Sequence, residues 1–240
     1  MMRRFFAPVL AAGLLAAGLL AGGAARAEDT LSPLRFQSAG TFGSIDLAAA
    51  QRGFAVYQGV CASCHGLKAL HYRDLQALGL TAEQVAGLAA SVKLADGSAA
   101  TPDSRFKPPA PMNMGGAVPP DLSTIAAQRP GGTDYIYHFL TGFGPVPAGV
   151  TLLPGHYYNA AFPGGQVSMP PVLRDNAVTY ADGTKATTAQ EATDVAEFLT
   201  WASDPDLSAR HAVGLRAAIF FAFLAIVAVL TKRRIWRQEG

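Results

Sequence analysis

The sequence contains two cysteines, and both lie in one short motif, Cys61-Ala-Ser-Cys64-His65. Two thiols three positions apart with a histidine next to them are typical of covalent haem attachment, in which the imidazole binds the iron. A thioredoxin-like thiol pair does not need the histidine and lies in a βαβ unit that this sequence does not predict. A disulfide across so short a loop has little geometric freedom, and zinc would need further ligands. The motif therefore predicts a c-type cytochrome.

The N-terminus has the pattern of an export signal. Arg3 and Arg4 precede an apolar run rich in Ala, Leu and Gly, and Ala25-Arg-Ala27 supplies a small-x-small cleavage site. We expect residues 1–27 to be a signal peptide, with an uncleaved anchor helix as the alternative. The haem domain, residues 28–209, would then be exported to the periplasm.

A second apolar segment, residues 212–231, lies near the C-terminus. Twenty helical residues rise about 30 Å, which is the thickness of the hydrocarbon core of a bilayer. Only residues 217–231 are free of charge, a length that also suits a buried core helix, but Arg216 can snorkel outward. Basic residues and a tryptophan follow at once: Lys232, Arg233, Arg234, Trp236 and Arg237. We therefore predict a transmembrane helix over 210–231, a cytoplasmic tail over 232–240, and a single-pass protein of the inner membrane.

The charge distribution changes once these segments are set aside. The whole chain has a formal charge of +2, but residues 28–209 hold 10 Lys and Arg against 16 Asp and Glu, which gives about −6. An acidic domain favours encounter with a basic partner, with ordinary solubility as the alternative explanation. No basic stripe with interleaved aromatic residues is present in the sequence, so nucleic-acid binding is not predicted.

The fold is expected to be mostly helical and rich in loops. The 25 Gly and 16 Pro in 240 residues argue against a coiled coil or helical bundle. An amphipathic helix is predicted over 44–60, with Ser44 as its N-cap and apolar positions at Ile45, Leu47, Ala48, Phe54, Val56, Tyr57 and Val60. A second helix is predicted from the capping box Thr188-Ala-Gln-Glu191, with Val195, Phe198, Leu199 and Ala202 on one face. Shorter helices are predicted over 81–92, 121–128 and 133–141.

The sixth ligand of the iron decides between electron transfer and an open, reactive site. Candidates outside the signal peptide are Met112, Met114, Met169, His71, His138, His156 and His211. Met169 stands before two prolines in a loop ahead of the closing helix, and a rigid loop can hold a thioether at bonding distance. Met169 is therefore favoured. Met112 or Met114, a histidine, or a vacant position stay open as alternatives, as does the role of any methionine as a core filler.

The chain resembles the cytochrome c1 family, the haem-bearing subunit of the cytochrome bc1 complex (respiratory complex III), in its bacterial form. The ordered blocks that carry the resemblance are Arg52-Gly-Phe-x-Val-Tyr57, Tyr72-Arg73, Pro119-Pro-Asp-Leu-Ser123, Gly132-Thr-Asp-Tyr135, Leu140-Thr-Gly-Phe143, Tyr158-Asn-x-x-Phe162, Met169-Pro-Pro171, Asp182-Gly-Thr184 and Asp194-Val-x-x-Phe-Leu-x-Trp201-Ala. These blocks, the haem motif and the basic end of the tail helix cover nearly the whole mature chain. Together they are far more specific than the Cys-x-x-Cys-His motif by itself.

The resemblance implies a site as well as a fold. It implies one haem c held by thioethers to Cys61 and Cys64, with His65 and Met169 as axial ligands. It further implies that Pro119 and Pro120 lie against the haem and that Arg129 and Tyr135 approach its propionates. The alternative roles are a solvated helix end for Arg129 and a core aromatic for Tyr135.

The resemblance also implies partners. A Rieske iron–sulfur protein would reduce this haem, and the haem would reduce a soluble c-type cytochrome, while the C-terminal helix packs on cytochrome b in a dimeric complex. The chain would be the electron-transfer subunit of a quinol–cytochrome-c reductase and not catalytic on its own. A tethered cytochrome that serves another respiratory chain, and a haem sensor or peroxidase with an open distal site, are the rival functions.

Overall fold

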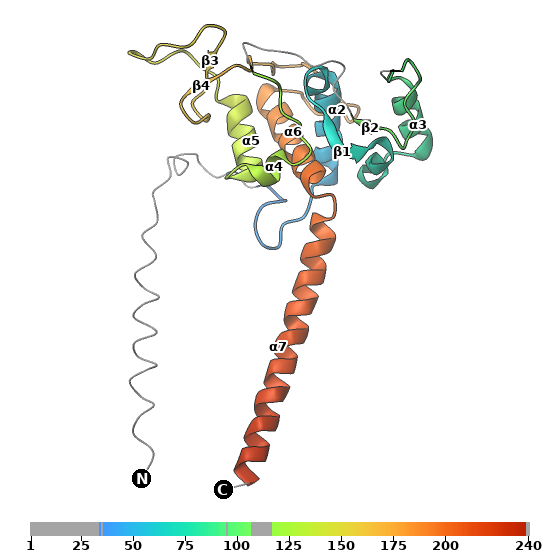
Figure 1. Cartoon of the computed structure of the whole chain (residues 1–240), viewed down its shortest axis with the longest axis vertical. Helices are drawn as coiled ribbons and strands as arrows, with labels where there is room; N and C mark the ends of the chain where they lie inside the picture. Colours follow the sequence, from blue (N-terminus) through green and yellow to red (C-terminus); the bar gives the residue numbers. More distant parts are fainter. Residues whose placement is uncertain (1–33, 35, 95, 107–116, 239–240) are drawn as a thin grey trace. The chain divides into compact units, whose positions relative to one another are not determined.

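The computed structural model describes residues 34, 36–94, 96–106 and 117–238, and Figure 1 shows their arrangement. The expected signal peptide and the alternative ligands Met112 and Met114 lie outside the described residues. The elements in chain order are α2 (Leu47–Gly59), η2 (Cys61–Ser63), β1 (Leu67–His71), η3 (Tyr72–Leu78), α3 (Ala82–Ala90), β2 (Arg105–Phe106), α4 (Ile125–Gln128), α5 (Gly132–Thr141), β3 (Tyr157–Tyr158), β4 (Gln166–Val167), α6 (Thr188–Ser203) and α7 (Leu207–Gln238). The predicted class, a mostly α, loop-rich domain with one long C-terminal helix, is confirmed.

Helix α6 is the centre of the core. It packs against α2, α4 and α5, and the predicted face of Val195, Phe198, Leu199 and Ala202 is buried. The expected capping box is wrong by one residue, because Thr187 accepts the Gln190 backbone N–H and caps the helix. Glu191 does not reach back to the helix start. It is buried instead, and its Oε1 accepts the backbone N–H of Val178 at 3.1 Å.

Helix α2 leads into the cysteine motif. The expected N-cap at Ser44 is wrong: the Asp46 side chain accepts the N–H groups of Ala48 and Ala49. Leu47 is exposed, and the buried face begins instead at Ala49 and includes Gly53. A Cβ on Gly53 would lie 2.0 Å from the Asp194 carbonyl oxygen, so a glycine is what allows α2 and α6 to approach this closely.

An ion pair joins the same two helices. Arg52 donates to both carboxylate oxygens of Asp194, at 2.8 and 3.0 Å, and also reaches Asp182 at 3.2 Å. Bidentate pairing of this kind is directional as well as strong. It raises the pKa of Arg52, with the Asp194 hydrogen bonds as the largest cause. The Arg52-Gly53 dipeptide therefore fixes both the distance and the orientation between α2 and α6.

The predicted short helices differ in outcome. The helix predicted over 81–92 is present as α3, which begins with a capping box between Thr81 and Gln84. Helix α5 begins one residue before its predicted start, after Gly131 in the left-handed conformation (φ 85°). The helix predicted over 121–128 begins only at Ile125. Its expected first residues, 121–123, instead form hydrogen bonds with the chain that follows His65. Two small antiparallel sheets, β1–β2 and β3–β4, were not predicted from the sequence.

Helix α7 is the one helix in the described part of the chain that is long and apolar enough to cross a membrane. Its most apolar stretch has a mean hydropathy of 2.5 and is not covered by other parts of the chain. Its 32 residues rise about 48 Å at the usual helical rise. The helix starts before the predicted 210–231 segment and continues through most of the predicted tail. Its first turn is joined to the 43–45 segment, because Ile45 N–H donates to Ser208 Oγ at 3.0 Å and His211 Nδ1 lies 2.7 Å from the Gly43 carbonyl.

Candidate functional site

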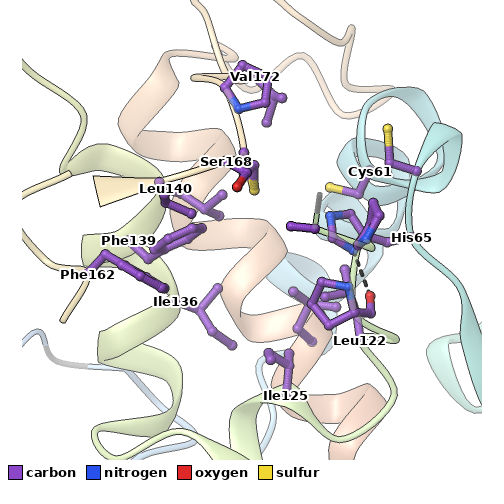
Figure 2. A pocket seen from close by; sticks show the side chains of 18 of the residues that line it. Cys61, His65, Leu122, Ile125, Ile136, Phe139, Leu140, Phe162, Ser168 and Val172 are labelled. Atoms are coloured by element: carbon purple, nitrogen blue, oxygen red, sulfur yellow. Dashed lines mark hydrogen bonds between the residues drawn. The ribbon is translucent and has the colours of Figure 1, made fainter. Parts of the chain in front are cut away.

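One cavity of about 410 Å³ gathers every residue that the sequence predicted for the site. Cys61, Cys64, His65, Pro119, Pro120, Arg129, Tyr135 and Met169 all line it. Figure 2 shows Cys61 and His65 on one side, and Phe139, Leu140 and Phe162 on the opposite side, with Ser168 between them at the rim. Most of the remaining lining residues are apolar, and five of them come from α5 and α6: Ile136, Phe139, Leu140, Val195 and Leu199. The size is within the range that proteins use to bury a small ligand or cofactor.

The cysteines enter the cavity where α2 ends. Cys61 starts η2, and its carbonyl accepts the backbone N–H groups of Cys64 at 3.0 Å and His65 at 2.9 Å. This tight turn places both sulfurs and the imidazole at one side of the cavity. Burial raises the pKa of the Cys61 thiol to about 12. Thiol–disulfide catalysts need a lowered thiol pKa, so the raised pKa of Cys61 does not favour a redox role for this thiol.

His65 has its orientation and tautomer set by one backbone group. Its Nδ1 lies 2.7 Å from the carbonyl oxygen of Pro120. A carbonyl can only accept, so Nδ1 carries the proton and Nε2 keeps its lone pair for a metal. Histidine ligands usually donate their second ring N–H to a carbonyl or carboxylate in this way. The Tyr57 hydroxyl also donates to the His65 carbonyl at 3.0 Å, which fixes the backbone of the same residue.

The Pro119–Ser123 block holds that carbonyl in place. Asp121 accepts the N–H of Lys68 at 2.9 Å, and Ser123 Oγ accepts the N–H of Ala69 at 2.9 Å. Leu122 N–H donates to the Gly66 carbonyl at 2.9 Å. These bonds join the block, residue by residue, to the chain that follows His65. Asp121 and Ser123 were not predicted from the sequence as residues of the site, although both stand in the same motif as the two prolines.

Met169 is positioned by a small hairpin. Strand β3 pairs with β4 so that Tyr157 opposes Val167 and Tyr158 opposes Gln166, and Met169 follows two residues after the ladder ends. Asn159 is completely buried and connects this hairpin to α5: its Nδ2 donates to the Phe139 carbonyl at 2.7 Å, and its Oδ1 accepts the Ala161 N–H at 3.0 Å. Asn159 belongs to the Tyr158–Phe162 block, but no role was predicted for it from the sequence.

Arg129 and Tyr135 lie together at the cavity. The Arg129 guanidinium carbon is 5.6 Å from the centre of the Tyr135 ring, and that ring stacks on Phe139 with 6.0 Å between the ring centres. Arg129 is exposed, whereas Tyr135 is buried. The arrangement leaves a cation at the edge of the cavity, where a negatively charged substituent of a bound group can meet it.

The histidines that the sequence offered as alternative ligands are placed differently from one another. His71 stands at the N-cap of η3, and His211 contacts the Gly43 carbonyl. Neither these two nor His138 belong to the described lining of the cavity. His156 does line it, and its Nε2 lies 3.1 Å from Ser168 Oγ. Met169 is thus the described thioether at the cavity, with His156 as the second histidine there.

The residues present fit a haem c. The donor set comprises two thiols, one imidazole with an available Nε2, and one thioether, all on the surface of a single apolar cavity. A flat, largely apolar cofactor with two carboxylates requires apolar walls, a cation at the edge and axial donors. The cavity offers each of these features from the chain's own residues.

Comparisons with known proteins agree with this geometry. A model of the Cytochrome C1 family matches residues 36–239, which include the whole cavity. The chain is 36% identical over 250 residues to a cytochrome c1 of Rhodospirillum rubrum, covering 90% of this chain and 92% of that protein. It is 40% identical over 212 residues to a mitochondrial cytochrome c1 haem protein of Solanum tuberosum, covering 82% and 81%. It is 39% identical over 217 residues to a Candida albicans protein named the mitochondrial cytochrome b-c1 complex catalytic subunit, covering 82% and 74%.

Proposed function

This chain belongs to the cytochrome c1 family, and on that premise we propose that it is the membrane-anchored haem c carrier of a quinol-oxidising cytochrome bc1 complex. In this role it takes electrons from a Rieske iron–sulfur protein and passes them to a soluble c-type cytochrome. The observation that carries the proposal is the 2.7 Å contact between His65 Nδ1 and the Pro120 carbonyl, because it leaves Nε2 available in the same cavity as Met169. Oxidation of the quinol belongs to the assembled complex.

The chain's own residues would hold the cofactor. Cys61 and Cys64 would form its thioether links, and His65 and Met169 would supply the two protein ligands of the iron. The haem, when bound, supplies a one-electron couple, and thioether ligation favours a high potential. Pro119 and Pro120 would lie against it, and Arg129 with Tyr135 would approach its propionates. The apolar lining of the cavity would exclude water and favour electron transfer over ligand exchange.

The negative charge of the haem domain (residues 28–209) supports a basic partner. Exposed carboxylates are spread along the described part of the chain: Glu83, Asp96, Asp103, Asp175, Asp182 and Asp206. Three others, Glu191, Asp194 and Glu197, are buried in α6 and do not contribute a surface for docking. Electron transfer to a basic soluble cytochrome should therefore slow as ionic strength rises, because salt screens charges beyond about 10 Å at 0.1 M. A rate that is independent of salt would contradict a charge-guided partner.

Helix α7 supports the membrane part of the proposal. Its apolar length fits a bilayer, and the basic residues from Lys232 onward favour a cytoplasmic C-terminus with the haem domain in the periplasm. Residues 1–27 would be removed as a signal peptide, and α7 would pack on cytochrome b within a dimeric complex. Cysteine labelling of single-cysteine additions at 30 and 239, in intact cells and in lysed cells, tests this orientation.

The ligand assignment can be tested on the full-length protein in detergent. Met169→Leu should keep the covalent haem, because both cysteines remain, but should admit carbon monoxide to the reduced iron and lower the midpoint potential. Met112→Leu and Met114→Leu are the matched controls, since both were candidate ligands. If either control admits carbon monoxide and Met169→Leu does not, the assignment is wrong. If the parent protein binds carbon monoxide readily, the open-site sensor or peroxidase replaces the electron carrier.

A further inference from the structure

We propose that the hydrogen bond between His156 and Ser168 holds the Met169 loop (residues 168–173) against the cavity. His156 is then a positioning residue for Met169, the distal ligand. The proposal rests on the proposed function, in which Met169 binds the iron. His156 lines the cavity, and Ser168 directly precedes Met169. The two side chains approach to 3.1 Å, between His156 Nε2 and Ser168 Oγ.

The direction of this bond follows from the other ring nitrogen. His156 Nδ1 lies 3.2 Å from the carbonyl oxygen of Pro154, which can only accept a hydrogen bond. In the neutral imidazole the proton is therefore on Nδ1, and Nε2 accepts from the Ser168 hydroxyl. The ring is fixed at both nitrogens, so it presents a rigid acceptor to the residue before Met169.

The bond lies where the hairpin has no other backbone support. The β3–β4 ladder ends at Val167, and Pro170 and Pro171 have no N–H to donate. Within the described part of the chain, residues 168–173 make one hydrogen bond, and it is the contact between Ser168 and His156. This side-chain hydrogen bond extends the contact between the two hairpin segments by one residue beyond the β3–β4 pairing, next to Met169.

The segment that carries His156 is itself attached to the opposite strand. Leu153 N–H donates to the Gln166 side chain at 3.0 Å, and Tyr157, next to His156, opposes Val167 in the ladder. His156 is thus held between two contacts with β4. Because His156 is held in place, its hydrogen bond restrains Ser168. A chain without this hydrogen bond would more often have Met169 displaced from the cavity.

Exogenous imidazole measures that displaced population. It binds ferric iron only when the sixth position is vacant, so its apparent affinity rises with the fraction of molecules in which Met169 is displaced. Loss of one neutral hydrogen bond should raise that fraction about fivefold. We therefore expect Ser168→Ala, in the oxidised full-length holoprotein in detergent, to bind imidazole about fivefold more tightly than the parent.

Two substitutions at His156 separate positioning from packing. Glutamine can place a polar atom where Nε2 lies and should keep affinity for imidazole near the parental value. Asparagine reaches only the Nδ1 position, so His156→Asn should behave as Ser168→Ala does. The double variant His156→Asn/Ser168→Ala should be no worse than either single one, because one interaction is lost in all three. Thr151→Ala, at an exposed residue of the same segment, is the control and should match the parent.

The outcomes also separate this proposal from the ligand assignment. Met169→Leu should bind imidazole far more tightly than any of these variants; if it matches the parent, the ligand assignment fails. If Met169→Leu behaves as expected but Ser168→Ala changes the affinity less than twofold, the assignment stands and the His156 proposal is wrong. Additive effects in the double variant would overturn it as well. Hydrogen exchange of the 166–173 amides, faster in Ser168→Ala than in Thr151→Ala, checks the loop without relying on iron chemistry.

Discussion

The two walls of the cavity are held in different ways. The His65 wall (residues 61–69 and 119–123) is joined by four hydrogen bonds, made by His65, Gly66, Lys68 and Ala69 on one side and by each residue from Pro120 to Ser123 on the other. The Met169 wall (residues 143–169) has a ladder of two residue pairs, a bridge between Phe143 and Asn159, side-chain bonds from the buried Asn159 and from Gln166, and the contact between His156 and Ser168. The proximal ligand is therefore itself hydrogen-bonded within two joined segments, whereas Met169 follows the last backbone pair of its hairpin and has one side-chain contact, at Ser168, next to it.

The largest expected effect is on the His65 wall. His65→Ala should lower the yield of holoprotein by about tenfold or more, since removal of mere supporting groups around a metal ligand already costs 10–100-fold in affinity. Haem-stained denaturing gels and the optical spectrum of membranes measure the yield. His71→Ala is the matched control, because His71 lies near in sequence but outside the described lining of the cavity. Equal yields for the two variants would contradict a ligand role for His65.

The next largest expected effect is on the packing of α2 against α6. Gly53→Ala places a Cβ about where the Asp194 carbonyl lies, 2.0 Å away, and must push α2 from α6. We expect a loss of about 3 kcal/mol in the free energy of unfolding, at the upper end for overpacking. Gly87→Ala is the control: no atom lies within 4 Å of its added Cβ, so it should gain up to about 1 kcal/mol from helix propensity. Chemical denaturation measures both, and similar values for the two would refute the close contact.

The sequence predicted the His65 wall better than the Met169 wall, and the reason is distance along the chain. Cys61, Cys64 and His65 are local, so their spacing alone specifies the chemistry. Helix α6 and the tail helix also follow from periodicity and apolar length. The role of Pro120 as the acceptor for His65, 55 residues away, could not be seen from spacing. The pairing of β3 with β4 escaped prediction because strands of two residues carry no alternation.

The errors at helix starts have a common physical cause. Ser44 and Thr188 both have the right chemistry for an N-cap, but Asp46 and Thr187 stand nearby with the same ability, and tertiary contacts select between them. Asp46 N–H donates to Glu197 at 2.8 Å, which holds the start of α2 on α6. Likewise, residues 121–123 stay outside a helix because they bond to the chain after His65. Local pattern fixes which helices form, and long-range partners fix where they begin.

A direct test of the comparison sets one polar residue from each wall against the other. Asn159→Ala leaves the Phe139 carbonyl and the Ala161 N–H without partners in a fully buried place, so we expect a loss of about 2 kcal/mol. Asp121→Ala removes the acceptor of Lys68 N–H, but that bond is exposed and water can replace it, so a loss of about 1 kcal/mol is expected.

Thermal or chemical unfolding of the holoprotein measures both losses, and imidazole affinity adds a second readout. Only Asn159→Ala should raise that affinity, because only Asn159 belongs to the Met169 wall. An equal rise in Asp121→Ala would mean that the two walls are mechanically coupled and are not held independently.

The smallest expected effect is a pH dependence that arises in α6, where Glu191 accepts the Val178 N–H. Glu191 is buried, and burial raises the pKa of its carboxyl group above the ordinary value. The folded protein therefore binds this proton more tightly than the unfolded chain does. Its stabilising contribution is present below the ordinary carboxyl pKa and is lost as the pH rises through the folded value. Glu191→Gln, which keeps an acceptor for Val178 N–H, should flatten this decline in the free energy of unfolding from pH 4 upward.

Glu83 provides the opposite case. It is exposed at the start of α3, and the hydrogen bond from its own backbone lowers the pKa of its carboxyl group. Its contribution is present at higher pH and is lost as the pH falls, so Glu83→Gln should leave the decline of the parent unchanged. Denaturant titrations at several pH values compare the two variants. A decline that persists in Glu191→Gln would place the responsible group elsewhere, with Glu197 next, because burial raises its pKa in the same direction.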